Sequence, residues 1–257
     1  MRVQVVLTVA ESKRLIARGI AAHPAVRAAL EQGIVAVAKG STNAYIVEEL
    51  TGRKIEKNHY VTGHTLPARA GEELKKSINA SLSDCVLRRG ALVPGLTVAA
   101  AVAEMGPGDV FLKGANALDY ERRQAAVLIG HPTGGTLGAT LGTIIARRIR
   151  LLIPVGLEKA VPGDLALAAR LVNEAPALDE EPPPDVPRPA LWLLNGEVFT
   201  EIEALATLCG VEAVPIAAGG IGGAEGAVRL LVSGDKPAVA QALALVREIQ
   251  GEAAFPG

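Results

Sequence analysis

The sequence predicts an α/β protein with an open, mostly parallel, Rossmann-like sheet and a smaller C-terminal α+β domain of ferredoxin-like kind. The main observation is a set of nearly apolar runs, each followed by glycine and separated mainly by helical patterns, an order typical of a parallel, doubly wound sheet. These runs lie at residues 34–38, 109–112, 125–129 and 150–155. The second observation is a β-α-β-β-α order over residues 190–249, which favours the small domain.

The third observation divides the chain. Residues 176–189 hold six prolines among acidic residues, and so many prolines are incompatible with helix or sheet interior. We therefore expect an α/β ligand-binding domain over residues 1–175, a proline-rich linker over 176–189, and a small α+β domain over 190–257. With 257 residues the chain is long enough for such a pair.

Composition excludes several classes of function. The chain has 26 basic and 27 acidic residues, and aromatic residues make up only 3%. A nucleic-acid partner is therefore not expected. No apolar stretch of about 18 residues lacks charge, Gly or Pro, so we expect no membrane partner and a cytoplasmic location. Cys85 and Cys209 are isolated, and His59 and His64 fall on opposite faces of a predicted strand at 58–63, so no metal or cofactor is expected.

The N-terminal region predicts two helices, at residues 12–22 and 25–32. The first carries an apolar stripe that includes Leu15, Ile16 and Ile20, with Lys13, Arg14 and Arg18 off that stripe. Further helices are predicted at 44–50, 96–105, 137–148 and 197–208, and residues 70–82 are partly helical.

Lys39, Gly40, Ser41, Thr42 and Asn43 follow the first apolar run and precede a helix. Free backbone N–H groups and the positive end of the helix dipole meet at such a point, which makes it an anion site. The alternative is an ordinary helix cap supplied by Ser41 or Thr42.

A second loop with similar residues follows the run at 109–112. Lys113, Gly114 and Asn116 repeat the pattern of a strand that ends in Lys-Gly with Asn just beyond, and Asp119 follows. The carboxyl ends of parallel strands share one edge of a sheet, where ligands bind in open α/β sheets. We therefore expect these two loops and a third, residues 130–136, to surround one pocket; the third contributes Gly134, Gly135 and Thr136.

These segments resemble ribose-5-phosphate isomerase type A and its superfamily, which includes DeoR-type sugar sensors and CoA transferases. Residues 38–50 are similar to the phosphate loop and helix of the isomerase, and 109–119 to its acidic catalytic segment. Residues 154–162 are similar to a strand end in the LUD branch. The resemblance covers roughly residues 10–162 and implies a phosphate-binding α/β domain.

The chain departs from the isomerase pattern at its acids. Lys113, Asn116 and Ala117 stand where the isomerases have two Asp and a Glu, and only Asp119 matches. Proton transfer between sugar carbons needs a positioned base, so isomerase activity is not expected. The same changes make the pocket electropositive and suited to an anion.

Three functions remain open from the sequence. The first is binding of a small anionic metabolite, a sugar phosphate or a CoA- or carboxylate-like compound, without turnover. The second is an enzyme of the same superfamily, such as an isomerase or an acyl or CoA transferase, with His131 as acid or base and Glu158 as nucleophile or base; Lys113 would then be an electrophile or, if desolvated, a reactive amine. The third is a structural homo-oligomer, with which the mean hydropathy of +0.31 is compatible.

Overall fold

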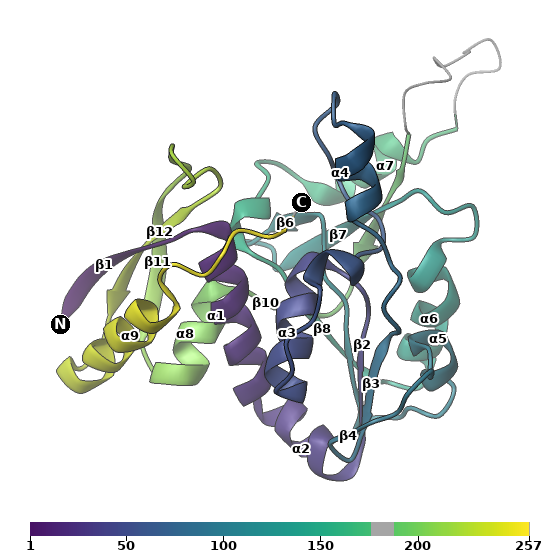
Figure 1. The fold of residues 1–257 in the computed structure, drawn as a ribbon, viewed down its shortest axis with the longest axis horizontal. Helices are drawn as coiled ribbons and strands as arrows, with labels where there is room; N and C mark the ends of the chain where they lie inside the picture. Colours follow the sequence, from purple (N-terminus) through teal and green to yellow (C-terminus); the bar gives the residue numbers. More distant parts are fainter. Residues whose placement is uncertain (176–187, 257) are drawn as a thin grey trace.

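The computed structural model describes residues 1–175 and 188–256, and it confirms the α/β class (Figure 1). A six-stranded mixed sheet forms the centre of the molecule and two three-stranded sheets flank it. Most of the predicted linker, residues 176–187, lies outside the described residues. No helix in the described part of the chain is long and apolar enough to cross a membrane.

The central sheet contains four parallel strands. In spatial order its strands are β10 (Glu197–Phe199), β8 (Arg150–Pro154), β5 (Val110–Leu112), β2 (Ile34–Val37), β3 (Cys85–Arg88) and β4 (Ala91–Leu92). The pairs from β10 to β2 are parallel, whereas β3 and β4 run antiparallel. The carboxyl ends of β2, β5 and β8 therefore meet at one edge.

The apolar run at residues 125–129 does not join this sheet, which corrects the prediction of a fourth parallel unit. It forms β7 (Gln124–Ile129), which pairs antiparallel with β6 (Ala117–Asp119) and with β9 (Ala190–Leu194). A turn at Arg123, whose φ is +55°, connects β6 to β7. The first part of β7 is covered on both sides, since Ala125 packs into the main core and Ala126 packs beside α7 (Leu165–Val172).

The third sheet joins the two ends of the described chain. Its middle strand, β12 (Val228–Ser233), pairs antiparallel with β1 (Arg2–Leu7) and with β11 (Glu212–Ala218). Figure 1 shows this sheet with α9 (Lys236–Ile249) to one side of the central sheet. The boundary predicted at residue 190 does not follow the sheets, because β9 and β10 pair with strands of the first part and β1 pairs with the second.

Helix α1 (Val9–Ala22) lies between α3 (Ser41–Thr51) and α8 (Glu201–Cys209). The contact with α8 is close: a Cβ added at Gly19 would lie 2.7 Å from the Cβ of Ala204. Because α1 is covered on several sides, Lys13 and Arg14 are 7% and 3% exposed, although the sequence places them off the apolar stripe. Charged side chains buried in this way need partners or a functional reason.

Arg14 is the hub of a buried ion-pair network. Its guanidinium lies 2.6 Å from Glu48 and 2.8 Å from Glu49, both on α3, and 2.9 Å from Glu252 in the segment after α9. Gly251 donates its N–H to Glu11 of α1 at 2.8 Å. These contacts hold the C-terminal segment across α1 and α3, where Phe255 reaches the Tyr45 ring, with 6.4 Å between the centroids.

The remaining elements are α2 (Pro24–Gln32), α4 (Glu72–Ser77), α5 (Val98–Ala101), α6 (Gly135–Ala146) and two 3₁₀ helices, η1 (Lys57–His59) and η2 (Leu157–Lys159).

Three of the elements predicted from the sequence differ in the structure. The strand predicted at 58–63 is replaced by η1, after which Tyr60 turns inward and donates its hydroxyl to Val37 O. The helix predicted at 96–105 is limited to α5. The helix predicted at 197–208 begins only at Glu201, because Thr200 and Glu203 form a capping box behind β10.

Candidate functional site

A cavity of about 1630 Å³ lies at the carboxyl edge of β2 and β5. One wall consists of the loops 39–43 and 113–116, which directly follow these two strands. β7 and β9 adjoin the loop 113–116, where Leu128 donates its N–H to Asn116 Oδ1 at 3.0 Å, and they line the cavity with apolar side chains that include Leu128 and Trp192, 40% and 38% exposed. The cavity thus has a polar side and an apolar side.

The loop 39–43 brings the start of α3 to the cavity. Gly40 occupies the cap position and no side chain caps the helix, so the first N–H groups keep their hydrogen-bonding capacity. Thr42 is 3% exposed and lines the cavity, and its Oγ1 has no hydrogen-bond partner. Asn43 joins the two strand ends by donating Nδ2 to Ala38 O at 2.7 Å and to Leu112 O at 3.3 Å.

Four lysines from different elements line the same cavity. Lys39 and Lys113 follow β2 and β5, Lys159 comes from η2 after β8, and Lys13 comes from α1. Lys39 donates to Ala80 O at 2.8 Å and lies 3.6 Å from Asp84. The described part of the lining contains no Asp or Glu. Positive charge therefore dominates the polar wall.

The lysine ammonium groups are held in an environment that disfavours their charge. Burial, followed by the neighbouring charge of Lys159, lowers the pKa of Lys113 to about 8. Burial also lowers the pKa of Lys13 to about 8, against an opposing effect of Glu158. The pKa of Lys159 is lowered by burial. An anion in the cavity would relieve this cost by restoring a partner for the ammonium groups.

Two carboxylates lie behind the lysines. Glu158 packs over Gly156, where an added Cβ would lie 1.7 Å from Glu158 Oε2, and this oxygen is buried without a hydrogen-bond partner. Glu201 is fully buried and accepts the Leu157 N–H at 3.0 Å. Burial, followed by the charge of Glu158, raises the pKa of Glu201 to about 7. Both acids lie outside the cavity lining, so Glu158 balances the charge of Lys13 and Lys159 from below.

The third loop, residues 130–134, forms the rim of the cavity before α6. His131 is exposed, and its Nδ1 lies 3.0 Å from Thr133 Oγ1 and 3.2 Å from Thr133 N. The loop packs tightly on the helix: a Cβ at Gly138 would lie 1.8 Å from Thr133 O. Glycine at position 138 therefore leaves room for Thr133 O, and this close contact sets the position of the loop that carries His131.

Replacing Gly138 by alanine should move this loop and lower the free energy of unfolding by about 1–3 kcal/mol, since the new Cβ overlaps a backbone oxygen. Gly142 on the same helix has nothing within 4 Å of an added Cβ, so Gly142→Ala should stabilise the protein by about 0.5–1 kcal/mol. Urea unfolding of both variants measures the difference. Equal effects of the two substitutions would show that the loop does not rest on Gly138.

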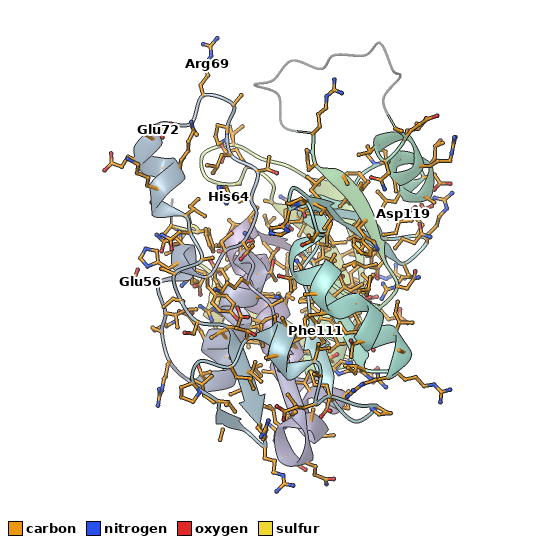
Figure 2. The ribbon with its side chains drawn as sticks, turned by 90° about the vertical axis from the view of Figure 1, so that its right-hand side faces the viewer. Glu56, His64, Arg69, Glu72, Phe111 and Asp119 are labelled. Carbon is orange, nitrogen blue, oxygen red and sulfur yellow. The ribbon has the colours of Figure 1, made fainter. Side chains whose placement is uncertain are left out.

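The structure brings most of the predicted site residues together. Residues 39–43, Lys113, Gly114, Asn116, His131 and Gly134 all line the cavity. Gly135, Thr136, Glu158 and Asp119 are outside the lining. Asp119 instead pairs with Arg122 at 2.8 Å, which lowers its pKa, and Figure 2 shows it on the side of the molecule that carries α7.

Sequence reasoning missed several lining residues, namely Lys13, His64, Lys159, Trp192 and Phe255. His64 lines the cavity although it is exposed, whereas Figure 2 shows Arg69 and Glu72 of the same region pointing away from the body of the molecule. Lys13 shares its helix with Glu11, Arg14 and Arg18, so its charge alone gives no local signal of a site. The described residues, His64 included, contain no group of three His, Cys, Asp or Glu side chains that could hold a metal ion.

Comparison of the chain with protein-family models, with curated proteins and with solved structures gives no match.

Proposed function

We propose that the protein binds a small anionic metabolite, a sugar phosphate or a CoA- or carboxylate-like compound, at the carboxyl edge of the central sheet. The observation that carries the proposal is the charge of the lining: four lysines and no carboxylate among the described residues. Holding several ammonium groups in a partly buried cavity whose described lining has no carboxylate is costly, and a bound anion offsets that cost.

The start of α3 supports a phosphate or carboxylate group at residues 40–43. Free N–H groups at a helix N-terminus, together with the helix dipole, form an anion site. The unpartnered Oγ1 of Thr42 adds a hydroxyl that can donate to the same anion. The apolar wall at Leu128 and Trp192 then contacts the body of the ligand.

The lining also supports the expectation that ribose-5-phosphate isomerase chemistry is absent. A general base must come within hydrogen-bond reach of the proton that it removes. No described carboxylate lines the cavity, and Glu158 is held behind Lys13 and Lys159. Membership of the isomerase and CoA transferase superfamily remains a prediction from the motifs.

Thr42→Val tests the anion site with opposite effects on stability and binding. Removing a buried hydroxyl without a partner should raise the free energy of unfolding of the ligand-free protein by about 1 kcal/mol. The same change should weaken phosphate binding about tenfold or more, because hydrogen bonds to charged groups contribute about 1.5–3 kcal/mol. Thermal shift with inorganic phosphate, ribose 5-phosphate and acetyl-CoA measures both effects.

Thr51→Val is the matched control at the other end of α3. Thr51 donates to Val47 O at 2.6 Å and lies outside the cavity lining. This variant should lose a little stability and keep the full phosphate response. The proposal fails if none of the three anions raises the melting temperature of the wild-type protein at millimolar concentration.

A further inference from the structure

The four cavity lysines are not equivalent, and the difference concerns their partners. Lys39 lies 3.6 Å from Asp84. Lys13 and Lys159 both face the charge of Glu158. Lys113 has no such carboxylate partner: its Nζ donates to Gly114 O at 3.3 Å, and its charged neighbour is a second cation, Lys159. Among the described residues, no ion pair involves Lys113.

An amine in these surroundings is predisposed to act as a nucleophile. A lysine that is desolvated and placed next to another cation keeps a larger fraction of the neutral, reactive form near neutral pH. Lys113 also lies at the end of β5, directly beside the strand end that leads into the anion site, because Asn43 bonds to the carbonyls of both Ala38 and Leu112. The amine and the anion site therefore open into the same cavity.

We propose that Lys113 forms a Schiff base with an aldehyde or ketone whose phosphate occupies the start of α3. This deepens the proposed function, on which it rests, by naming the ligand class as phosphorylated carbonyl compounds. The phosphate provides the binding contacts, and the carbonyl carbon is presented to Lys113 Nζ. Lys159, held by its bond to Ala115 O at 2.8 Å, is the neighbouring acid.

The reaction balances with groups that the cavity provides. Neutral Lys113 Nζ attacks the carbonyl carbon, a C–N bond forms, and the carbonyl π electrons move to oxygen. A proton passes from nitrogen to that oxygen to give the carbinolamine. The Lys159 ammonium then protonates the hydroxyl, water leaves, and the nitrogen lone pair forms the C=N bond of an iminium ion. Lys159 is left neutral and recovers its proton from solvent.

Pyridoxal 5′-phosphate and pyridoxal form a suitable pair of probes. Both carry the same aldehyde, and only the first carries a phosphate, so their comparison isolates the effect of the phosphate. The full-length protein is incubated with each compound and reduced with borohydride, and the adduct is located by peptide mass mapping. We expect one adduct on Lys113 that forms at least about tenfold faster than on exposed Lys75, as the lower pKa of Lys113 implies. Pyridoxal should react more slowly at Lys113, and saturating inorganic phosphate should protect this lysine.

Lys113→Arg keeps the positive charge and removes the nucleophile, so it should lose the adduct at this position while Lys75 of the same variant reacts as in the wild-type protein. Lys75→Arg should behave like the wild-type protein. Modification spread over exposed lysines without preference for Lys113, or an unchanged adduct in Lys113→Arg, overturns the inference. Failure of the proposed function looks different, since inorganic phosphate would then neither stabilise the wild-type protein nor protect Lys113.

Discussion

Replacing Arg14 by methionine is expected to lower the free energy of unfolding by about 3–5 kcal/mol, since it leaves a buried carboxylate without its main partner. Glu48 has a side chain only 3% exposed and lies 2.6 Å from the Arg14 guanidinium. Methionine fills part of the space but brings no charge. Lys57 and Lys54, at 3.4 and 3.2 Å from Glu48, compensate only in part. Urea unfolding measures the loss.

Arg18→Met is the matched control on the same helix. Arg18 pairs with Glu248 at 3.0 Å, but these side chains are 26% and 65% exposed, so the loss should stay below about 1 kcal/mol. Adding Glu48→Gln to Arg14→Met should recover part of the stability, because the stranded charge is then removed. A loss in Arg14→Met no larger than that in Arg18→Met would contradict the network.

The second large effect concerns the pH dependence of stability through Glu201. Its pKa rises from 4.5 in the unfolded chain to about 7 in the folded protein, because the carboxyl is buried and Glu158 lies nearby. The folded state therefore binds the proton more tightly, and stability falls as pH rises through this window. The shift corresponds to a loss of about 3 kcal/mol once both states are ionised above pH 7.

Glu201→Gln should remove this loss because the amide stays neutral and keeps an acceptor for Leu157 N–H. At pH 8 the variant should be more stable than the wild-type protein by about 1–3 kcal/mol, and at pH 5 it should be equal or slightly less stable. Urea midpoints at several pH values between 5 and 8 test this. Glu31→Gln, at an exposed position, should leave the wild-type profile unchanged. Parallel profiles for Glu201→Gln and the wild-type protein would refute the assignment.

The sequence predicts β2, β5 and β8 well because each is short and mostly apolar, with glycine or a charged residue within two residues of its end, but it assigns β10 to a helix. It fails where pairing depends on distant residues. The run at 125–129 has the composition of a parallel strand, yet it pairs with β9, whose position in the chain gives no local signal. Likewise, nothing within residues 2–7 indicates that β1 pairs with β12.

The same contrast between local signals and distant contacts holds for the candidate site. The loops 39–43 and 113–116 could be predicted to meet because the carboxyl ends of parallel strands share an edge, and both line the cavity. Lys13 could not, because a lysine off the apolar stripe of a helix is normally solvated, and only the packing of α1 against α3 and α8 buries it. Glu158, which the motif places near the site, packs its carboxylate against Gly156 and is not part of the lining, although its charge acts on Lys13 and Lys159.

The pairing of β1 with β12 also sets an order of events during synthesis. β1 is synthesised before any strand of the other two sheets, whereas β12 is synthesised only after all of them. Until then the edges of β1 have no partner strand, and contacts between such distant residues form slowly. Phe255 follows β12 in the chain, so the part of the cavity wall that it provides beside Lys13 can be added only after the lysine loops are in place.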